Sequence, residues 1–190
     1  MILPIVAYGS PILKKKGEEI APDYPQLKEL IANMYETMYN AHGVGLAAPQ
    51  IGLGIRLFIV DSGTINDEEP DQKPMKKVFI NPVITEEAGD EWLFNEGCLS
   101  IPDVREDVER KSKIKIEYFD ENFKKYIEEY EGIPARIIQH EYDHVEGVLF
   151  TDHLSGMRRT MIKKRLDKIT KGQIRIDYRM KFPKKTGNRR

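Results

Sequence analysis

Cysteine, tryptophan and histidine are scarce in this chain of 190 residues, which contains 1 Cys, 1 Trp and 4 His. A single cysteine cannot form a disulfide within the chain, and this is typical of proteins in a reducing compartment. No run approaches the roughly 18 apolar residues that a membrane-spanning helix needs. The apolar start, residues 1–6, is interrupted by Pro4 and lacks the basic leader and cleavage site of a signal peptide. We therefore expect a soluble, intracellular protein with a cytoplasmic location.

Charge is balanced over the whole chain but not along it. The 30 Lys and Arg nearly equal the 31 Asp and Glu, which gives a formal net charge of −1. From Ser155 onward, however, 14 Lys and Arg face only 2 Asp. No repeat or linker divides the chain, and its length suffices for a hydrophobic core. We therefore expect a single domain over residues 1–190, in which residues 155–190 form a basic C-terminal helix, strand and tail.

The most informative stretch is Gln139–His144, where two histidines and two acidic residues lie close together. On a helix, residues four apart share a face, with Cβ atoms about 5–6 Å apart, so His140 and His144 can bind one cation. Glu141, about 100° further around, can contact a water on that cation without being a ligand, as in the His-Glu-x-x-His pattern of metal hydrolases. The alternative is two polar side chains beside a core, and the scarcity of histidine argues against it.

A catalytic zinc-like site usually takes three protein ligands and leaves one position for water, so a third ligand is needed. No glutamate follows Glu146, and Phe150 stands where one large class of such hydrolases has a third histidine. His153 lies too late, which leaves Cys98. A lone cysteine is more often a small buried hydrophobic residue. Beside two helical histidines, however, a thiolate completes a three-ligand site suited to Zn2+ or Fe2+.

Apolar periodicity predicts an α+β fold, with short antiparallel strands packed around the central metal-binding helix. An amphipathic helix is expected over residues 23–41, with Pro25 in its first turn. The metal helix is expected to begin near Gly132 and Pro134. The polar residues 62–77 are expected to form an exposed loop. Strands are expected at residues 55–61, 77–84, 92–94, 113–119 and 126–130.

The segment Gly43–Gly52 formally matches the dinucleotide-binding pattern Gly-x-Gly-x-x-Ala, but its context excludes that function. The fingerprint must follow a strand and open a helix, whereas here a helix is expected before it, Pro49 interrupts it and a strand follows. One interpretation is a helix stop with a glycine-rich turn. The functional alternative is that the glycines let a substrate backbone approach closely, while the amide of Gln50 donates to a developing oxyanion.

Three motifs together resemble those of the peptide deformylase family. The family patterns are Gly-apolar-Gly-apolar-Ala-Ala-x-Gln, Glu-Gly-Cys-apolar-Ser and His-Glu-apolar-Asp-His, and they match residues 43–50, 96–100 and 140–144 in the same order. Tyr142 replaces the usual aliphatic residue of the third motif. The resemblance covers roughly residues 2–154. Each motif alone is modest, but the combination is specific.

The resemblance implies a metal-dependent hydrolase that removes the formyl group from N-formylmethionine at the N-terminus of newly synthesised polypeptides. Cys98, His140 and His144 would hold the metal. In the family this metal is characteristically Fe2+, although Zn2+, Ni2+ or Co2+ can occupy the site. The substrates would be N-formylmethionyl nascent peptides.

The family chemistry assigns roles to three further residues. The cation lowers the pKa of its bound water, and Glu141 would act as general base toward that water and then as general acid toward the leaving amine. The backbone N–H of Leu99 and the amide of Gln50 would join the metal in stabilising the charge on the formyl oxygen. Loss of one such oxyanion donor costs about 2.7–4 kcal/mol of barrier.

The resemblance also suggests how the substrate binds. The peptide would lie as an added strand between Val44 and Gly45 on one side and Gly97 on the other, a mode that ignores most side chains. An apolar slot beside the metal would select the first residue, and its burial of a Met side chain contributes about 1.5–3 kcal/mol. The candidates for this slot are Val44, Phe94, Ile133, Ile137 and the ring of His140. The aliphatic residues are equally compatible with an ordinary core.

The basic C-terminal part is expected to form a helix over residues 155–171 and a strand over residues 174–180. A run of charge is usually a solvated face. For a deformylase, however, whose substrate leaves a ribosome covered with polyanionic RNA, we predict salt-sensitive ribosome docking. The residues expected to carry it include Arg158, Arg159, Lys163 and Lys164. The segment 62–77 and the residues after Lys171 lie outside the shared motifs, so the resemblance assigns them no role.

Two other classes of protein share part of this pattern. A metalloendopeptidase would use the same helix motif and activated water, but both third ligands expected for it are missing. A non-catalytic RNA-binding module with a structural metal would need four protein ligands. Only His42 and His153 are left to supply the fourth, so coordination by either would favour this alternative.

Overall fold

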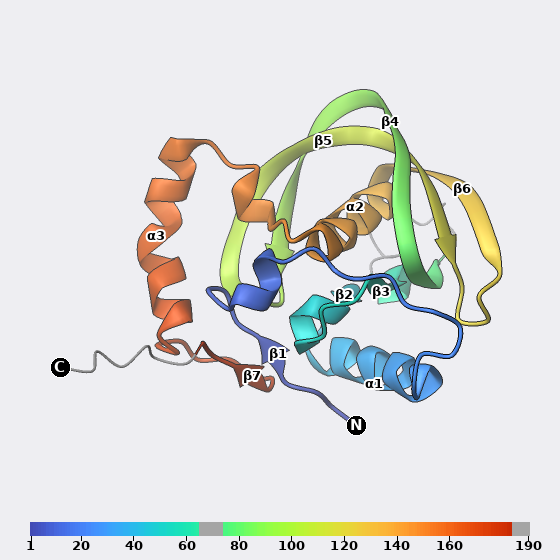
Figure 1. Ribbon diagram of the computed structural model, residues 1–190. Helices are drawn as coiled ribbons and strands as arrows, with labels where there is room; N and C mark the ends of the chain where they lie inside the picture. The colour runs from blue at the N-terminus through green and yellow to red at the C-terminus, as the bar shows by residue number, and fades with distance from the viewer. Residues whose placement is uncertain (65–73, 184–190) are drawn as a thin grey trace.

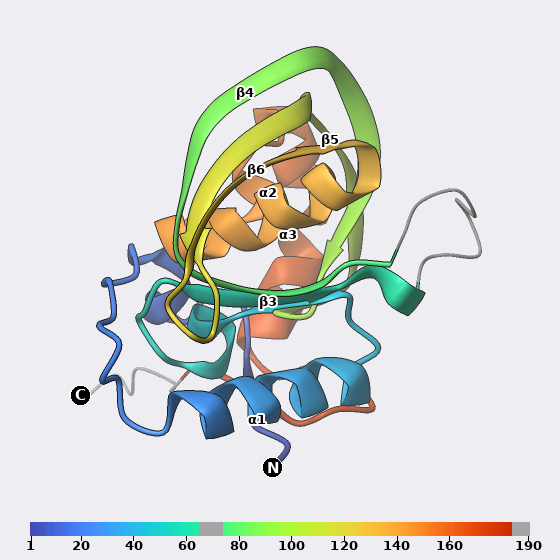
Figure 2. The same cartoon turned by 90° about the vertical axis from the view of Figure 1, so that its right-hand side faces the viewer.

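The computed structural model describes residues 1–64 and 74–183, and its centre is an antiparallel sheet flanked by helices (Figures 1 and 2). The sheet has five strands in the order β2-β3-β4-β5-β6. They are β2 (Gly45–Ala47), β3 (Leu57–Asp61), β4 (Lys76–Cys98), β5 (Ile101–Phe119) and β6 (Lys125–Glu131). The helices are α1 (Leu27–Asn40), α2 (Gly132–Glu146) and α3 (Gly156–Thr170). This arrangement confirms the predicted α+β fold.

Strand β3 is covered on both sides, which explains its uninterrupted apolar sequence. Leu57 and Ile59 pack in one cluster with α1, whereas Phe58 and Val60 pack in another with α2. Successive side chains of a strand point to opposite faces, so the two helices lie on opposite sides of the sheet at this strand (Figure 2). The helix that carries the histidine motif is therefore enclosed between β3 and the other strands, as a central helix should be.

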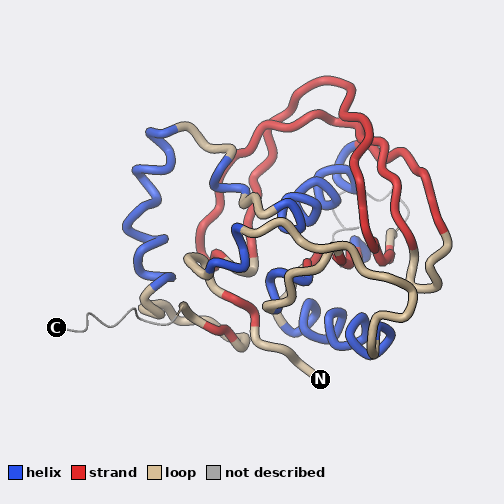
Figure 3. Tube along the Cα trace, viewed as in Figure 1, coloured by secondary structure: helices blue, strands red, loops and turns tan. Residues whose placement is uncertain are grey.

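Strands β4 and β5 form a long hairpin that curves over α2 (Figures 1 and 3). Residues 77–84 and 92–94, which the sequence predicts as two strands, are parts of the single strand β4. Strand β5 begins at Ile101, whereas the sequence predicts a strand only from residue 113. The expectation of short strands is therefore wrong for this pair. The polar stretch between the expected segments remains in the ladder because its backbone pairs with β5, with register shifts along the way, while its side chains are mostly exposed.

Two expectations before β3 also need correction. Helix α1 begins at Leu27, so Pro25 precedes it, because Gln26 has a left-handed conformation with φ of 55°. The segment 43–52 is not only a turn. It contains strand β2, which pairs with β3, followed by a short 3-10 helix.

The C-terminal part consists of α3 and an extended segment. Helix α3 buries Ile162, Leu166 and Ile169 and stands at the periphery of the molecule (Figure 1). The predicted strand over residues 174–180 is wrong in extent, since strand β7 comprises only Met180–Lys181. Its parallel partner, β1 (Ile5–Val6), is itself only 2 residues long. Half-buried and exposed residues still alternate from residue 174 to 180. The alternation of apolar and polar residues in the sequence therefore reflects one half-buried side of an extended segment, and not strand pairing along its whole length.

Short 3-10 helices complete the fold. They are η1 (Pro11–Lys14), η2 (Ala48–Ile51), η3 (Ser62–Thr64) and η4 (Phe150–Asp152). At its two ends, the loop expected over residues 62–77 contains η3 and the first residues of β4. Its middle, residues 65–73, lies outside the described residues, and so does the polar tail over residues 184–190. None of the described helices is both long and apolar enough to cross a membrane.

Candidate metal centre

Three potential metal ligands meet where β4 ends against α2. Cys98 is the last residue of β4, and His140 and His144 are one turn apart on α2, with ring centroids 5.1 Å apart. The sulfur and one nitrogen of each ring all lie within 4.8 Å of one another. Cys98 Sγ is 3.3 Å from Nε2 of His144. Residues 1–64 and 74–183 contain no other group of three or more such ligands.

These donors fit a soft divalent metal. Burial raises the pKa of the Cys98 thiol, but the imidazoles of His144 and His140 outweigh burial and lower this pKa to about 5. The lowered pKa favours the thiolate, which is the form of cysteine that binds metals. A thiolate with two imidazoles suits Zn2+ or Fe2+, and three protein ligands leave a position open for water or substrate.

Glu96, for which the sequence predicted no separate role, orients His140. Its carboxylate lies 2.9 Å from His140 Nδ1, which leaves Nε2 free to bind a metal. Glu96 is only 3% exposed. It accepts hydrogen bonds from Arg110 Nε at 2.7 Å and from Arg136 Nη1 at 3.0 Å. A carboxylate behind a ligating histidine fixes the ring and raises its basicity, so this buried ion cluster supports the metal centre.

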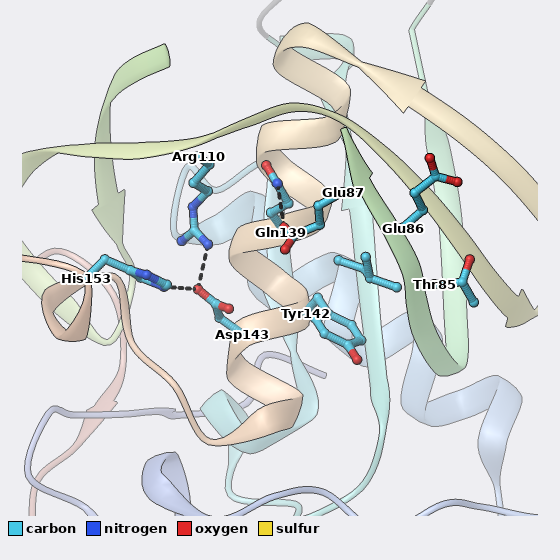
Figure 4. Close-up of a pocket in the computed structure, with 9 residues that line it drawn as sticks. Thr85, Glu86, Glu87, Arg110, Gln139, Tyr142, Asp143 and His153 are labelled. Atoms are coloured by element: carbon cyan, nitrogen blue, oxygen red, sulfur yellow. Dashed lines mark hydrogen bonds and ion pairs between the residues drawn. The ribbon is translucent and has the colours of Figure 1, made fainter. Parts of the chain in front are cut away.

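Arg110 connects this cluster to a polar pocket on another face of α2 (Figure 4). Its Nη1 lies 2.8 Å from Asp143 Oδ2, and the same oxygen lies 2.7 Å from His153 Nε2. Glu87 and Gln139 also line this pocket of about 330 Å3 and hydrogen bond to each other. The Asp of the His-Glu-x-Asp-His motif therefore holds an arginine and not the metal.

We expect Glu96→Gln to lower the free energy of unfolding by about 3–5 kcal/mol, because the buried Arg136 then keeps no carboxylate among the described residues and Arg110 keeps only Asp143. Burial raises the pKa of Glu96, but hydrogen bonds from His140 and Arg110 outweigh burial and hold this pKa well below 4.5. The stabilisation by Glu96 is therefore complete above about pH 4.5 and is lost as the pH falls further. Urea unfolding from pH 6 to 3.5 measures both effects.

The matched control is Glu86→Gln, which changes an exposed carboxylate of the same strand. It should alter the free energy of unfolding by less than about 0.5 kcal/mol. The stability difference between wild type and Glu96→Gln should shrink as the pH falls below 4.5. A difference that stays constant down to pH 3.5 would contradict the assigned charge state of Glu96.

Glu141 lies beside the ligands and is 4% exposed. Its Oε2 has no hydrogen-bond partner within the described residues. Burial raises the pKa of Glu141 to about 7, although positive charge on His140 and His144 opposes the rise. Gly45 provides the room for this carboxylate, because a Cβ at that position would lie 2.4 Å from Glu141 Oε1. The site thus holds a carboxyl group that exchanges a proton near neutral pH.

Gln50 faces the ligands with its amide nitrogen. Its Oε1 accepts a hydrogen bond of 2.8 Å from the backbone N–H of Ala47, so the NH2 group must point the other way. This nitrogen lies 3.5 Å from Cys98 Sγ and 3.4 Å from Ser100 Oγ. The sequence expectation of a donor at this place is therefore compatible with the geometry.

A cavity of about 540 Å3 brings together nearly all the residues that the sequence assigned to the site. They are Val44, Gly45, Gln50, Phe94, Gly97, Cys98, Leu99, Ile133, Ile137, His140 and Glu141. His144 does not line this cavity. It is 1% exposed and lies against Cys98.

Two features of the site were not predicted. One is the pair of buried arginines. Arg110 lies on the charged strand β5, Arg136 lies near the start of α2, and nothing in the sequence around either residue indicates that it binds Glu96. Tyr178 also lines the cavity, although no local pattern relates the end of the chain to Cys98. Both features depend on contacts between distant segments.

The two spare histidines do not join the metal group. His42 Nε2 lies 3.8 Å from Asp177 Oδ2 at the surface, and His153 is bonded to Asp143. Within the part of the chain that the structure describes, no fourth protein ligand accompanies the three. A structural metal needs four, so this geometry disfavours the non-catalytic RNA-binding alternative.

Comparison with known proteins points to one family. The family model described as polypeptide deformylase matches residues 2–160. A peptide deformylase of Flavobacterium psychrophilum is 60% identical over 193 residues, which cover 97% of this chain and 100% of that protein. The peptide deformylase of Christiangramia forsetii is 58% identical over 190 residues, with coverage of 96% and 97%. The crystal structure of a peptide deformylase from Legionella pneumophila has a TM-score of 0.79 and 37% identity, and covers 91% of this chain and 98% of that chain.

Proposed function

This chain belongs to the peptide deformylase family, whose members are hydrolases, and we propose that it removes the formyl group from N-formylmethionine on newly synthesised polypeptides in the cytoplasm. The observation that supports this most directly is the convergence of Cys98, His140 and His144 beside Glu141 in an open cavity. The proposed metal is Fe2+, for which Zn2+, Ni2+ or Co2+ can substitute, because the donors are one thiolate and two imidazoles.

Glu141 is the proposed general base and acid. When bound, the metal supplies a Lewis acid that acidifies water and polarises the formyl carbonyl. The buried carboxylate of Glu141 accepts the proton of the water that attacks the formyl carbon. Because its pKa lies near 7, Glu141 then gives that proton to the leaving amine. Its unpartnered Oε2 supports this role, since no described residue competes for the proton.

Gln50 and Leu99 are the proposed oxyanion donors. The amide nitrogen of Gln50 faces the ligands because Ala47 holds its oxygen. Leu99 directly follows Cys98 and lines the same cavity, so its backbone N–H lies one residue from the sulfur. Donors held in place before the reaction act on the charge that develops on the formyl oxygen.

The substrate peptide is proposed to bind as an added strand. Strand β2 is an edge strand, and the last residues of β4, which include Gly97, pair only with β5 in the described residues. The two free edges line the same cavity through Val44, Gly45 and Gly97. Their unpaired backbone groups suit an extended peptide of any sequence.

Selection of the first residue is proposed to come from the apolar slot predicted from the sequence. Val44, Phe94, Ile133, Ile137 and the ring of His140 all line the cavity. Ile137 is 7% exposed and also belongs to the core cluster around Phe58, so it serves the core as well as the cavity wall. A methionine side chain would bury apolar surface against this wall.

The proposed function is tested by formate release from formyl-Met-Ala after anaerobic purification and metal analysis. We expect equimolar metal and release of formate with the peptide bond left intact. An unformylated peptide with a central Met tests the endopeptidase alternative in parallel. Cleavage of that peptide, or no formate from formyl-Met-Ala with the metal site filled, would overturn the proposal.

We also propose that the basic face of α3 docks on the ribosome. Arg158 bonds to Glu106, whereas Arg159, Lys163 and Lys164 are exposed and form no ion pair with described residues. Changing these four residues to Gln should reduce cosedimentation with ribosomes at low salt, because fewer counterions are released from the RNA. Formate release from a short peptide should stay unchanged.

The control replaces four basic residues of the sheet, namely Lys111, Lys113, Lys115 and Lys125. Each lies within ion-pair distance of a glutamate, so their removal changes net charge equally but leaves α3 intact. This control should cosediment nearly as well as wild type. Equal losses in the two variants would attribute any binding to net charge and would exclude a docking face on α3.

A further inference from the structure

The chain end returns to the metal site after α3. We call residues 173–183 the C-terminal arm. Its backbone is anchored at the N-terminus, because the N–H of Ile5 donates to Arg179 O at 2.8 Å and the N–H of Ala7 donates to Lys181 O at 2.9 Å. The family match ends at residue 160, so the arm lies outside the segment that defines the family.

Tyr178 is the residue of the arm that reaches the site. Its side chain lines the 540 Å3 cavity, and its hydroxyl donates a hydrogen bond of 2.7 Å to the carbonyl oxygen of Leu99. Leu99 and Ser100 form the tight turn between β4 and β5. The other carbonyl of this turn, Ser100 O, accepts a hydrogen bond of 2.8 Å from the N–H of Tyr8. The two ends of the chain therefore hold both carbonyl groups of the turn.

A second contact of the arm involves His42, which also lines the cavity. Asp177 Oδ2 lies 3.8 Å from His42 Nε2, next to the segment that enters β2. Both side chains are more than 70% exposed, at 75% and 79%, and exposed pairs of this kind contribute little free energy. The partly buried hydrogen bond of Tyr178 is therefore the contact through which the arm acts on the site.

We propose that Tyr178 is a positioning residue for deformylation, a role that rests on the proposed function above. The hydroxyl of Tyr178 fixes the Leu99 peptide groups, so that the Leu99 N–H points to the place where the oxyanion forms. Tyr178 holds the carbonyl oxygen of Leu99. Only Cα and the carbonyl carbon of the same residue separate this oxygen from the Leu99 nitrogen. A turn held at only one carbonyl can rotate its peptide planes, and a rotated N–H would no longer align with the oxyanion.

The test is Tyr178→Phe, which removes the hydroxyl and keeps the ring against its neighbours. Because the oxyanion exists only in the transition state, we expect kcat for formyl-Met-Ala to fall about 3- to 10-fold, the range of one hydrogen bond, with KM nearly unchanged. Metal content and melting temperature should remain those of wild type. Tyr126→Phe is the matched control, since the Tyr126 ring stacks on Tyr118 at 5.5 Å and its hydroxyl makes no hydrogen bond within the described residues.

The outcomes separate a positioning role from a purely structural one. Equal kcat in Tyr178→Phe and Tyr126→Phe would overturn the inference while leaving the deformylase activity intact. Loss of metal or a lower melting temperature in parallel with kcat would overturn it too, because the bond would then only hold the fold. Absence of formate release from wild type would instead overturn the proposed function, and the positioning role with it.

Discussion

Replacement of Glu141 by Ala should leave the metal bound and reduce turnover by at least about a hundredfold, the lower range for loss of a general base. The carboxylate is not one of the three clustered ligands, so its removal does not change the donor set. It is, however, the buried group beside them with a pKa of about 7, and it is the group proposed to accept and return the proton. Formate release and metal analysis on the same preparation measure both quantities.

Two comparisons make this result specific to the proton transfer. Glu129→Ala removes an exposed carboxylate on β6 that lies 3.5 Å from Lys115, and it should leave turnover unchanged. KM should change little in Glu141→Ala, because the lost interaction belongs to the transition state. A variant that loses both metal and activity would instead show that Glu141 helps to hold the ligands, and its role as a base would have to be abandoned.

The clustering of Cys98, His140 and His144 could be predicted from sequence, because helical spacing and the scarcity of cysteine single these residues out. His140 and His144 share a helical face by their spacing alone, and Glu141 is placed by the same geometry. Cys98 is the only cysteine in the chain, so it is the only residue that can supply a thiolate ligand. The structure brings these residues within one cavity or directly against it. Rare residue types combined with helical periodicity therefore carry most of the information about the candidate site.

The supporting ion cluster could not be predicted in this way. Arg110 lies on a strand where charged and apolar residues are interspersed, so its sequence indicates a solvated face. It is buried because β5 places it against Glu96 and Asp143. The continuity of β4 has the same origin, since its polar middle stays extended only because β5 pairs with it. Such pairings between distant segments leave no local pattern.

The same reasoning explains the C-terminal arm. Alternation of apolar and charged residues correctly indicated one half-buried side in residues 174–180, but the partner is a 2-residue strand at the other end of the chain. The hydrogen bond from Tyr178 to Leu99 O follows from this closure of the two termini. Site residues of this kind become visible only when the whole chain is folded.

Replacement of His144 by Ala should abolish metal binding and with it activity. Loss of a residue that only hydrogen bonds to a metal ligand already lowers metal affinity by about 10- to 100-fold. Loss of one of three direct ligands should therefore weaken metal affinity by more than about a hundredfold. His144 Nδ1 has no hydrogen-bond partner within the described residues, so the only polar contact that the substitution removes there is that of Nε2 with Cys98. Titration of the metal-free protein with Zn2+ or Co2+ gives the affinity without an activity assay.

The structure offers a matched control for this prediction in His153. This histidine follows α2 in the sequence and contacts a carboxylate, Asp143 at 2.7 Å, but it lies outside the metal group. His153→Ala should therefore bind metal as wild type does. Metal added in excess should raise the melting temperature of wild type and of His153→Ala, because a ligand that binds only the folded state stabilises it. It should not do so for His144→Ala, and a metal-dependent rise in that variant would mean that the ion is held elsewhere.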